Sequence, residues 1–196
     1  MKKFLIKLCL VSFAVCGFGI EKENINSVVQ KDLNQAVIII KQPTSLTQKS
    51  QKLFEMFDGY FDYARMARIA LGAHTKALNA EQIKLFEREF VAKLKESFVE
   101  KLSLYTNQRF VVAQSFAPPK PKNRYFVDVD IVGGTQTYKL NFKLYTKEAA
   151  NDYLVYDVEV VGVSVVGLYR SQLANIKTGD LDALIAAVKQ TSVAVK

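Results

Sequence analysis

Apolar side chains recur at steps of three or four residues between Asn79 and Tyr105. This spacing places them on one stripe of a helix of about six turns, roughly 35 Å long at about 1.5 Å per residue. Asn79 is the predicted N-cap, and Glu81 lies in the first turn, where an acidic group favours the helix dipole. The stripe comprises Ile83, Phe86, Phe90, Leu94, Phe98, Leu102 and Tyr105.

The hydrophobic period changes from helical to alternating after this segment. Residues 109–116, 124–132, 138–145 and 153–161 predict four strands of an antiparallel sheet with one apolar face. Gly133 and Gly134 predict a hairpin turn between the second and third strands. The face predicted to be apolar comprises Tyr125, Val127, Val129, Ile131, Tyr138, Leu140, Phe142, Leu144, Leu154, Tyr156, Val158 and Val160.

Further helices are predicted on both sides of the strands. One covers residues 21–41, and a second begins at Ser45 after Pro43. Asp62 can cap a short helix that stops at Gly72. Two short helices follow the strands, the second capped by Thr178 or Asp180. The order of elements predicts an α+β fold, with helices packed on one face of a curved four-stranded antiparallel sheet.

The first 19 residues have the pattern of a signal peptide. A basic start is followed by an apolar run from Phe4 to Val15, which is too short to span a bilayer, and cleavage after Cys16 or Gly19 fits the small-residue rule loosely. Val15 disfavours lipid modification of Cys16, because that modification needs a small residue before the cysteine. We therefore expect an exported, soluble chain, in which residues 20–196 form a single domain without any cysteine.

The net charge of +8 falls to +5 when the predicted signal peptide is removed, since 24 basic and 19 acidic side chains remain. Export argues against nucleic acid as a partner. The excess positive charge is compatible with anionic lipid headgroups or acidic protein surfaces, and equally with a role in solubility alone. Thirteen Phe and nine Tyr, with no Trp, can fill a core or line an apolar cavity.

Enzyme chemistry is not indicated by the sequence. Gly162, Ser164 and Gly167 resemble a G-x-S-x-G nucleophile elbow, but the second glycine comes one residue too late. The single histidine, His74, is distant in sequence and is expected at the surface or at a helix end, with no metal cluster around it. Ser164 is more simply the N-cap of the next helix, after a turn at Gly162. Asp128 and Asp130 are expected on the polar side of a strand rather than as a catalytic pair.

Three motifs, in order, resemble the MlaC family of periplasmic phospholipid-binding proteins. They are FDYARMARIALG at residues 61–72, EQIKLFEREFVAKLKESFVEKL at 81–102, and VYDVEVVGVSVVGLYRSQL at 155–173. Together with the predicted signal peptide and the strands between the motifs, the resemblance covers nearly the whole mature chain. The sequence departs from the family pattern at Thr75, Val161, Gly167 and Leu173, which puts in doubt any family role for those side chains.

The resemblance implies a non-enzymatic phospholipid carrier in the periplasm. Such a protein would move lipid between an inner-membrane ABC-type lipid transporter complex and an outer-membrane lipoprotein complex, and so maintain the lipid asymmetry of the outer membrane. It would need no cofactor, because phospholipid is its cargo. Exposing two acyl chains of about thirty CH₂ groups to water costs about 25 kcal/mol, so a carrier must enclose them. The alternative is a periplasmic binding or chaperone module for protein clients.

The surplus of aligned apolar side chains predicts an internal hydrophobic pocket between the long helix and the sheet. Two roles are predicted for Arg170. It either pairs with Asp157 at the strand-to-helix turn or binds a lipid phosphate. The predicted lipid-binding residues are Phe86, Phe90, Leu94 and Phe98 on one wall, Tyr138, Leu140, Phe142 and Val158 on the other, and Met66, Leu71, Val163 and Tyr169 at the ends.

Overall fold

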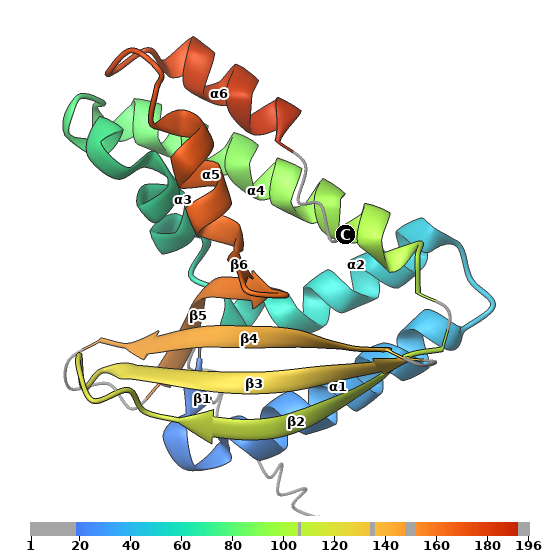
Figure 1. The fold of residues 1–196 in the computed structure, drawn as a ribbon. Helices are drawn as coiled ribbons and strands as arrows, with labels where there is room; N and C mark the ends of the chain where they lie inside the picture. The colour runs from blue at the N-terminus through green and yellow to red at the C-terminus, as the bar shows by residue number, and fades with distance from the viewer. Residues whose placement is uncertain (1–18, 106, 134–135, 148–151, 192–196) are drawn as a thin grey trace, which may run out of the picture.

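The computed structural model describes residues 19–105, 107–133, 136–147 and 152–191. Helices precede and follow a run of antiparallel strands, as the hydrophobic pattern predicts (Figure 1). The elements are β1 (Ile20–Glu21), α1 (Ile25–Lys41), α2 (Leu46–Phe57), α3 (Tyr63–Leu71), α4 (Ala80–Leu102), β2 (Arg109–Phe116), β3 (Arg124–Gly133), β4 (Gln136–Thr146), β5 (Asp152–Val160), β6 (Val163–Ser164), α5 (Val165–Leu173) and α6 (Leu181–Gln190).

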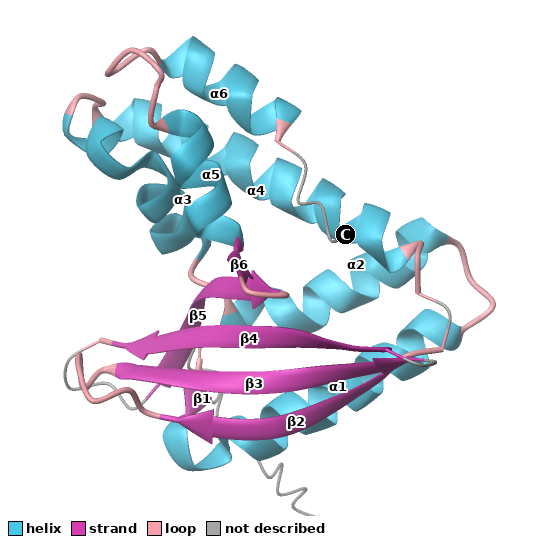
Figure 2. Cartoon of the chain, viewed as in Figure 1, coloured by secondary structure: helices cyan, strands magenta, loops and turns pink. Residues whose placement is uncertain are grey.

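The sheet has more strands than the predicted four. Its order is β1-β5-β4-β3-β2, every pairing is antiparallel, and β6 also pairs with β5 (Figure 2). The two additional strands, β1 and β6, each contain two residues. A strand this short shows no alternation of apolar and polar side chains, so the pattern that revealed the other four could not reveal these.

The predicted apolar face of β5 is wrong in its first half. The pairing of β4 with β5 shifts between Lys143, which lies opposite Asp157, and Leu144, which lies opposite Val155. Tyr156 is therefore an extra residue in a β-bulge, and a bulge of one residue reverses which side chains point to each face. Tyr153 and Val155 are buried on the core side, together with Val158 after the bulge, whereas Leu154 lies opposite Tyr145 on the other face.

The helices form two groups around the sheet. α1 runs along the face that carries the buried Val127 and Val129 and packs against β2 (Figure 1). α3, α4, α5 and α6 gather on the side of β5, and the long α4 packs on α3 and α6. The predicted direct packing of the long helix stripe against the sheet is thus replaced in large part by packing against other helices.

The helix boundaries follow the predicted caps. Asn79 accepts a hydrogen bond from the backbone N–H of Gln82, which completes a capping box at the start of α4. The side chains of Asp62 and Asp180 cap α3 and α6 by accepting a hydrogen bond from the backbone N–H of Arg65 and of Ala183, respectively. Gly72 ends α3 with φ of 55°, a conformation that glycine adopts without the steric cost of a Cβ atom.

Two predictions concern residues that the structure leaves undescribed. The predicted signal peptide, with Cys9 and Cys16, lies outside the described residues except for Gly19. Gly134 of the predicted hairpin turn also lies outside them. Within the described part of the chain, none of the helices is long and apolar enough to cross a membrane.

Candidate functional site

The buried apolar side chains form two main clusters that meet along one line of contact. The helical cluster lies among α3, α4, α5 and α6, and the sheet cluster lies between α1 and the sheet. Phe61 and Val158 pack against both clusters, and we call this line of contact the seam. The buried members of the helical cluster are Met66, Ala67, Ala70, Leu71, Leu78, Phe86, Phe90, Val165, Val166, Tyr169, Leu173, Leu184 and Val188, and those of the sheet cluster are Ile20, Ile25, Leu33, Val127, Val129, Leu144, Tyr153 and Val155.

The predicted lipid-binding residues are divided between the clusters and the surface. Leu94 borders the helical cluster, and Val158 lies at the seam. Phe98 and Val163 are 42% and 49% exposed and belong to neither cluster. Tyr138 lies near the start of β4, where its hydroxyl donates a hydrogen bond to Gln136. Of the rest, Met66, Leu71, Phe86, Phe90 and Tyr169 are buried in the helical cluster, and Leu140 and Phe142 are half-buried against the sheet cluster.

A half-buried ionic and aromatic group borders the exposed Phe98. The rings of Phe98 and Phe54 lie 5.6 Å apart, and Lys95 Nζ lies 4.7 Å from the centre of the Phe54 ring. Lys95 also pairs with Asp58 at 2.5 Å, while the hydroxyl of Tyr63 donates to the other oxygen of Asp58 at 2.7 Å. Burial, reinforced by Asp58, raises the pKa of Tyr63 well above its ordinary value, so this hydroxyl keeps its proton.

Asp157 joins the sheet to α5. Its carboxylate is only 3% exposed and accepts hydrogen bonds from Ser164 Oγ at 2.7 Å and from the backbone N–H of Val166 at 3.2 Å. Lys143 supplies the opposite charge at 3.3 Å and pairs with Glu159 at 2.7 Å. Burial alone would lower the pKa of Lys143, but these two carboxylates outweigh it and raise the pKa above its ordinary value.

Of the two arrangements predicted for Arg170, the pairing with Asp157 is wrong, and contact with a lipid phosphate stays a prediction. Arg170 is exposed, and its side chain lies beside Gly72, where an added Cβ would come within 3.2 Å of Arg170 Nε. In the described part of the molecule, Lys143 is the cation that pairs with Asp157. The sequence could not single out Lys143, because it pairs with Asp157 across two strands and not within the turn motif.

Ser164 is an N-cap, as predicted, and not part of a nucleophile elbow. Its Oγ accepts a hydrogen bond from the backbone N–H of Gly167 at 2.9 Å and donates to Asp157. His74 lies just after the end of α3, which is one of its two expected positions, but it is not at the surface: its side chain is only 5% exposed, and its Nε2 lies 3.0 Å from the carbonyl oxygen of Leu173. The sequence could not show this burial, because it arises from packing of the segment after α3 against α5.

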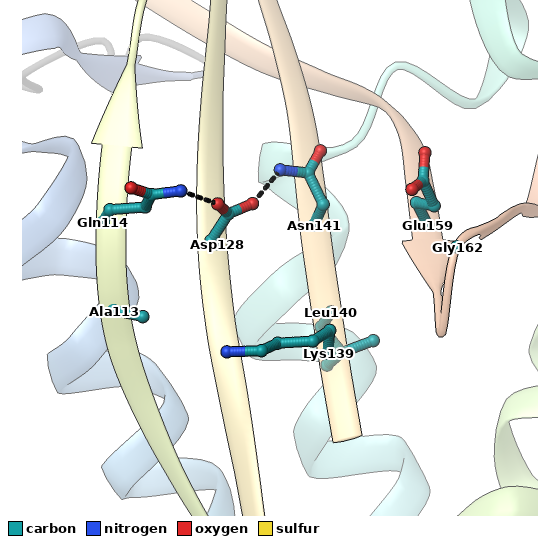
Figure 3. A pocket seen from close by; sticks show the side chains of 8 residues that line it. All are labelled: Ala113, Gln114, Asp128, Lys139, Leu140, Asn141, Glu159 and Gly162. Carbon is teal, nitrogen blue, oxygen red and sulfur yellow. Dashed lines mark hydrogen bonds between the residues drawn. The ribbon is translucent and has the colours of Figure 1, made fainter. Parts of the chain in front are cut away.

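One cavity, of about 530 Å³, is an open groove on the face of the sheet opposite the sheet cluster. Gln114 donates a hydrogen bond to Asp128 at 2.5 Å, and Asn141 donates to the other oxygen of Asp128, so one polar row crosses three strands (Figure 3). The groove is lined by Ala113, Gln114, Asp128, Lys139, Leu140, Asn141, Glu159 and Gly162.

A second groove, of about 250 Å³, lies where α1, α2 and the end of α4 meet. Ile40, Leu46 and Leu102 are among its lining residues, together with Lys41 and Lys49. Neither groove lies between the helical and sheet clusters, so the internal hydrophobic pocket stays a prediction. The described residues also contain no group of three or more His, Cys, Asp or Glu side chains that could hold a metal ion.

The fold therefore defines an α+β protein whose two main apolar clusters meet at a seam beside β5. The sequence model of the family described as MlaC protein matches residues 30–190. The chain thus belongs to the MlaC family, as its three motifs indicate.

A solved structure shares this fold. It is the phospholipid-binding protein from Ralstonia solanacearum in complex with a phospholipid, with a TM-score of 0.69 and 19% sequence identity. The similarity covers 84% of the present chain and 97% of the Ralstonia chain. At this level of identity the likeness establishes the fold. A comparison with curated proteins found no match to this sequence.

Proposed function

We propose that this protein is a periplasmic phospholipid carrier. It would take lipid between an inner-membrane ABC-type transporter complex and an outer-membrane lipoprotein complex, and so maintain the asymmetry of the outer membrane. Membership of the MlaC family supports this role, and so does the fold shared with a protein that binds a phospholipid. Both point to a binding and transport protein rather than an enzyme.

The observation that carries the proposal is the seam between the two apolar clusters. Val158 contacts both clusters without being fully buried, and Phe142, opposite Val158 on β4, is also half-buried. Two separately packed clusters can separate along such a line at lower cost than a single interlocked core, because fewer close contacts are lost. Acyl chains inserted there would replace the lost contacts with new apolar ones.

The two sides of the seam would hold different parts of the acyl chains. Leu94 on α4 borders the helical cluster, and Phe98 lies one helical turn further along α4, 42% exposed. Both side chains become more buried if an acyl chain lies along this part of α4. Enclosing about thirty CH₂ groups at about 0.8 kcal/mol each would offset the cost of opening the seam.

Native mass spectrometry of the purified chain, followed by lipid extraction, tests the proposal. We expect a bound phospholipid on the native protein, and a reduced lipid-bound fraction in the Phe142→Ser variant. Phe126→Ser is the matched control, because Phe126 lies on the neighbouring strand opposite Lys143 and points to the other face of the sheet. The control should keep its lipid.

The proposal is contradicted if the native chain carries no lipid and takes none up from vesicles. Co-purification of peptides without lipid would favour a module that binds protein clients. Equal loss of lipid in both variants would mean that the effect comes from general destabilisation of the sheet and not from the seam.

A further inference from the structure

Two arginines from distant parts of the chain meet over a pair of tyrosine rings. Arg65 lies in the first turn of α3, and Arg124 is the first residue of β3. The guanidinium carbon of Arg65 lies 3.9 Å from the ring centre of Tyr145 and 5.7 Å from that of Tyr156. That of Arg124 lies 5.4 Å and 4.7 Å from the same two centres. Both guanidinium groups therefore contact the same two rings, near the end of β4 where Tyr145 lies.

Among the residues that the structure describes, neither arginine has a carboxylate partner. Arg65 Nε and Arg124 Nη1 are buried and have no hydrogen-bond partner. A buried donor on a charged group costs free energy when it is left unpaired, and two like charges in one place add to that cost. A bound anion would remove both penalties.

Asp62, the carboxylate nearest to Arg65 in sequence, already accepts hydrogen bonds through both of its oxygens. Asp62 accepts a hydrogen bond from the backbone N–H of Arg65 at 2.9 Å through one oxygen, and from the hydroxyl of Tyr145 through the other. Its negative charge offsets part of the positive charge, but its oxygens serve the helix cap and the tyrosine. Lys143, whose charge also acts on Tyr156, is balanced by Asp157 and Glu159. Arg65, Arg124 and Asp62 together carry one unit of positive charge, whereas Lys143 with Asp157 and Glu159 carries one unit of negative charge.

We propose that Arg65 and Arg124 form a binding site for a phosphate group, carried either by a phospholipid headgroup or by free phosphate. Guanidinium groups present paired N–H donors that match phosphate oxygens, and stacking on tyrosine rings holds those donors in place. Both arginines keep part of their surface open to solvent. A phosphate group suits two guanidinium groups better than a carboxylate does, because it has more acceptor oxygens and they are not confined to one plane.

The phosphate site adjoins the seam but does not depend on it. Phe61, which packs at the seam, directly precedes Asp62, which accepts the hydrogen bond from Tyr145 beneath the two arginines. Tyr145 lies opposite Arg124 in the β3–β4 pairing and points to the face of the sheet away from the buried Leu144. The arginine group and the sheet cluster therefore lie on opposite faces of the same sheet end, and the site can exist whether or not the seam takes acyl chains.

Isothermal titration calorimetry with two probes tests this site. The purified chain, freed of any co-purifying lipid, is titrated with inorganic phosphate and separately with dihexanoyl phosphatidylglycerol at constant ionic strength. We expect Arg65→Gln and Arg124→Gln each to weaken phosphate binding about tenfold or more, since each removes charge-assisted hydrogen bonds. Arg68→Gln on the same helix and Arg109→Gln at the start of β2 are the matched controls, because both arginines are exposed, and they should bind like the native chain.

The outcomes separate the two sources of the phosphate. Weaker binding of inorganic phosphate alone supports a site for the free anion, and weaker binding of the lipid supports a headgroup site. Equal affinities in native protein, test variants and controls for both probes overturn the proposal. Where a glutamine variant fails to fold, Arg124→Lys and Arg65→Lys keep the charge, and the ³¹P chemical shift of added phosphate reports contact directly. An unchanged shift in these folded proteins and in the native chain also overturns the proposal.

Discussion

The helical cluster and the sheet cluster differ in their aromatic content: three of the described aromatic side chains are buried in the helical cluster, and one, Tyr153, is buried in the sheet cluster. Phe86, Phe90 and Tyr169 are fully buried in the helical cluster, where Phe90 meets Tyr169 edge to face at 5.0 Å. Phe142, at the border of the sheet cluster, is only half-buried. A close-packed interior has no space for an additional molecule. The difference indicates that the buried centre of the helical cluster mainly stabilises the fold, whereas the border of the sheet cluster at Phe142 is less tightly enclosed.

Truncation of one phenylalanine on each side tests this comparison most strongly. Phe90→Ala should lower the free energy of unfolding by about 3–5 kcal/mol, because it leaves a cavity in a filled cluster. Phe142→Ala removes a similar volume from a half-buried position, so its cost should be clearly smaller. Urea denaturation of lipid-free protein measures both changes. Similar losses for the two variants would mean that the clusters are equally well packed.

The connection between the two regions depends on the buried carboxylate of Asp157. Asp157→Ala should lower the free energy of unfolding by about 3 kcal/mol, because Lys143 loses a buried partner and the start of α5 loses its acceptor. Asp130→Ala is the matched control, since Asp130 pairs with the largely exposed Lys139 and should cost less than about 1 kcal/mol. Chemical denaturation of both variants gives the comparison, and equal costs would argue against Asp157 as the main connection.

The cap of α5 makes a smaller contribution at the same connection. Ser164→Ala should cost about 1 kcal/mol, because the backbone N–H of Gly167 loses its acceptor. Ser171→Ala, on the exposed side of the same helix, should change the unfolding free energy by less than about 0.5 kcal/mol. Thermal unfolding of both variants measures the difference. A serine nucleophile would instead make esterase activity depend on Ser164, and we expect no such activity.

Because Lys143 forms ion pairs where the sheet joins α5, the free energy of unfolding should depend on pH in the alkaline range. The pKa of Lys143 is raised in the folded protein by Glu159 and Asp157, so its stabilising effect is complete below the ordinary lysine pKa. This contribution should be lost as the pH rises through the raised value. The Lys143→Met variant should therefore lose less stability than the native chain between pH 9 and pH 11.5. Lys139→Met is the control, and the same pH response in both variants would contradict this role for Lys143.

Several local features could be predicted because they depend on neighbouring residues alone. Asn79, Asp62 and Ser164 each cap the helix that the sequence assigns to them, since a side chain near a helix start meets the free N–H groups of that turn. The turn at Gly162, with φ of 79°, follows from the same local logic. The candidate site was less predictable, because its parts come from segments that are distant in sequence.

The amino-acid sequence by itself determined the helices, the four long strands, their caps and the membership of the MlaC family, because periodicity, capping and motifs are properties of short stretches of chain. Only the tertiary structure decided that α4 packs on other helices, that Tyr156 bulges from β5, and that Lys143 rather than Arg170 pairs with Asp157. It also decided that Arg65 and Arg124 meet over Tyr145. These outcomes depend on which distant surfaces come together, and that is set by the packing of the whole chain.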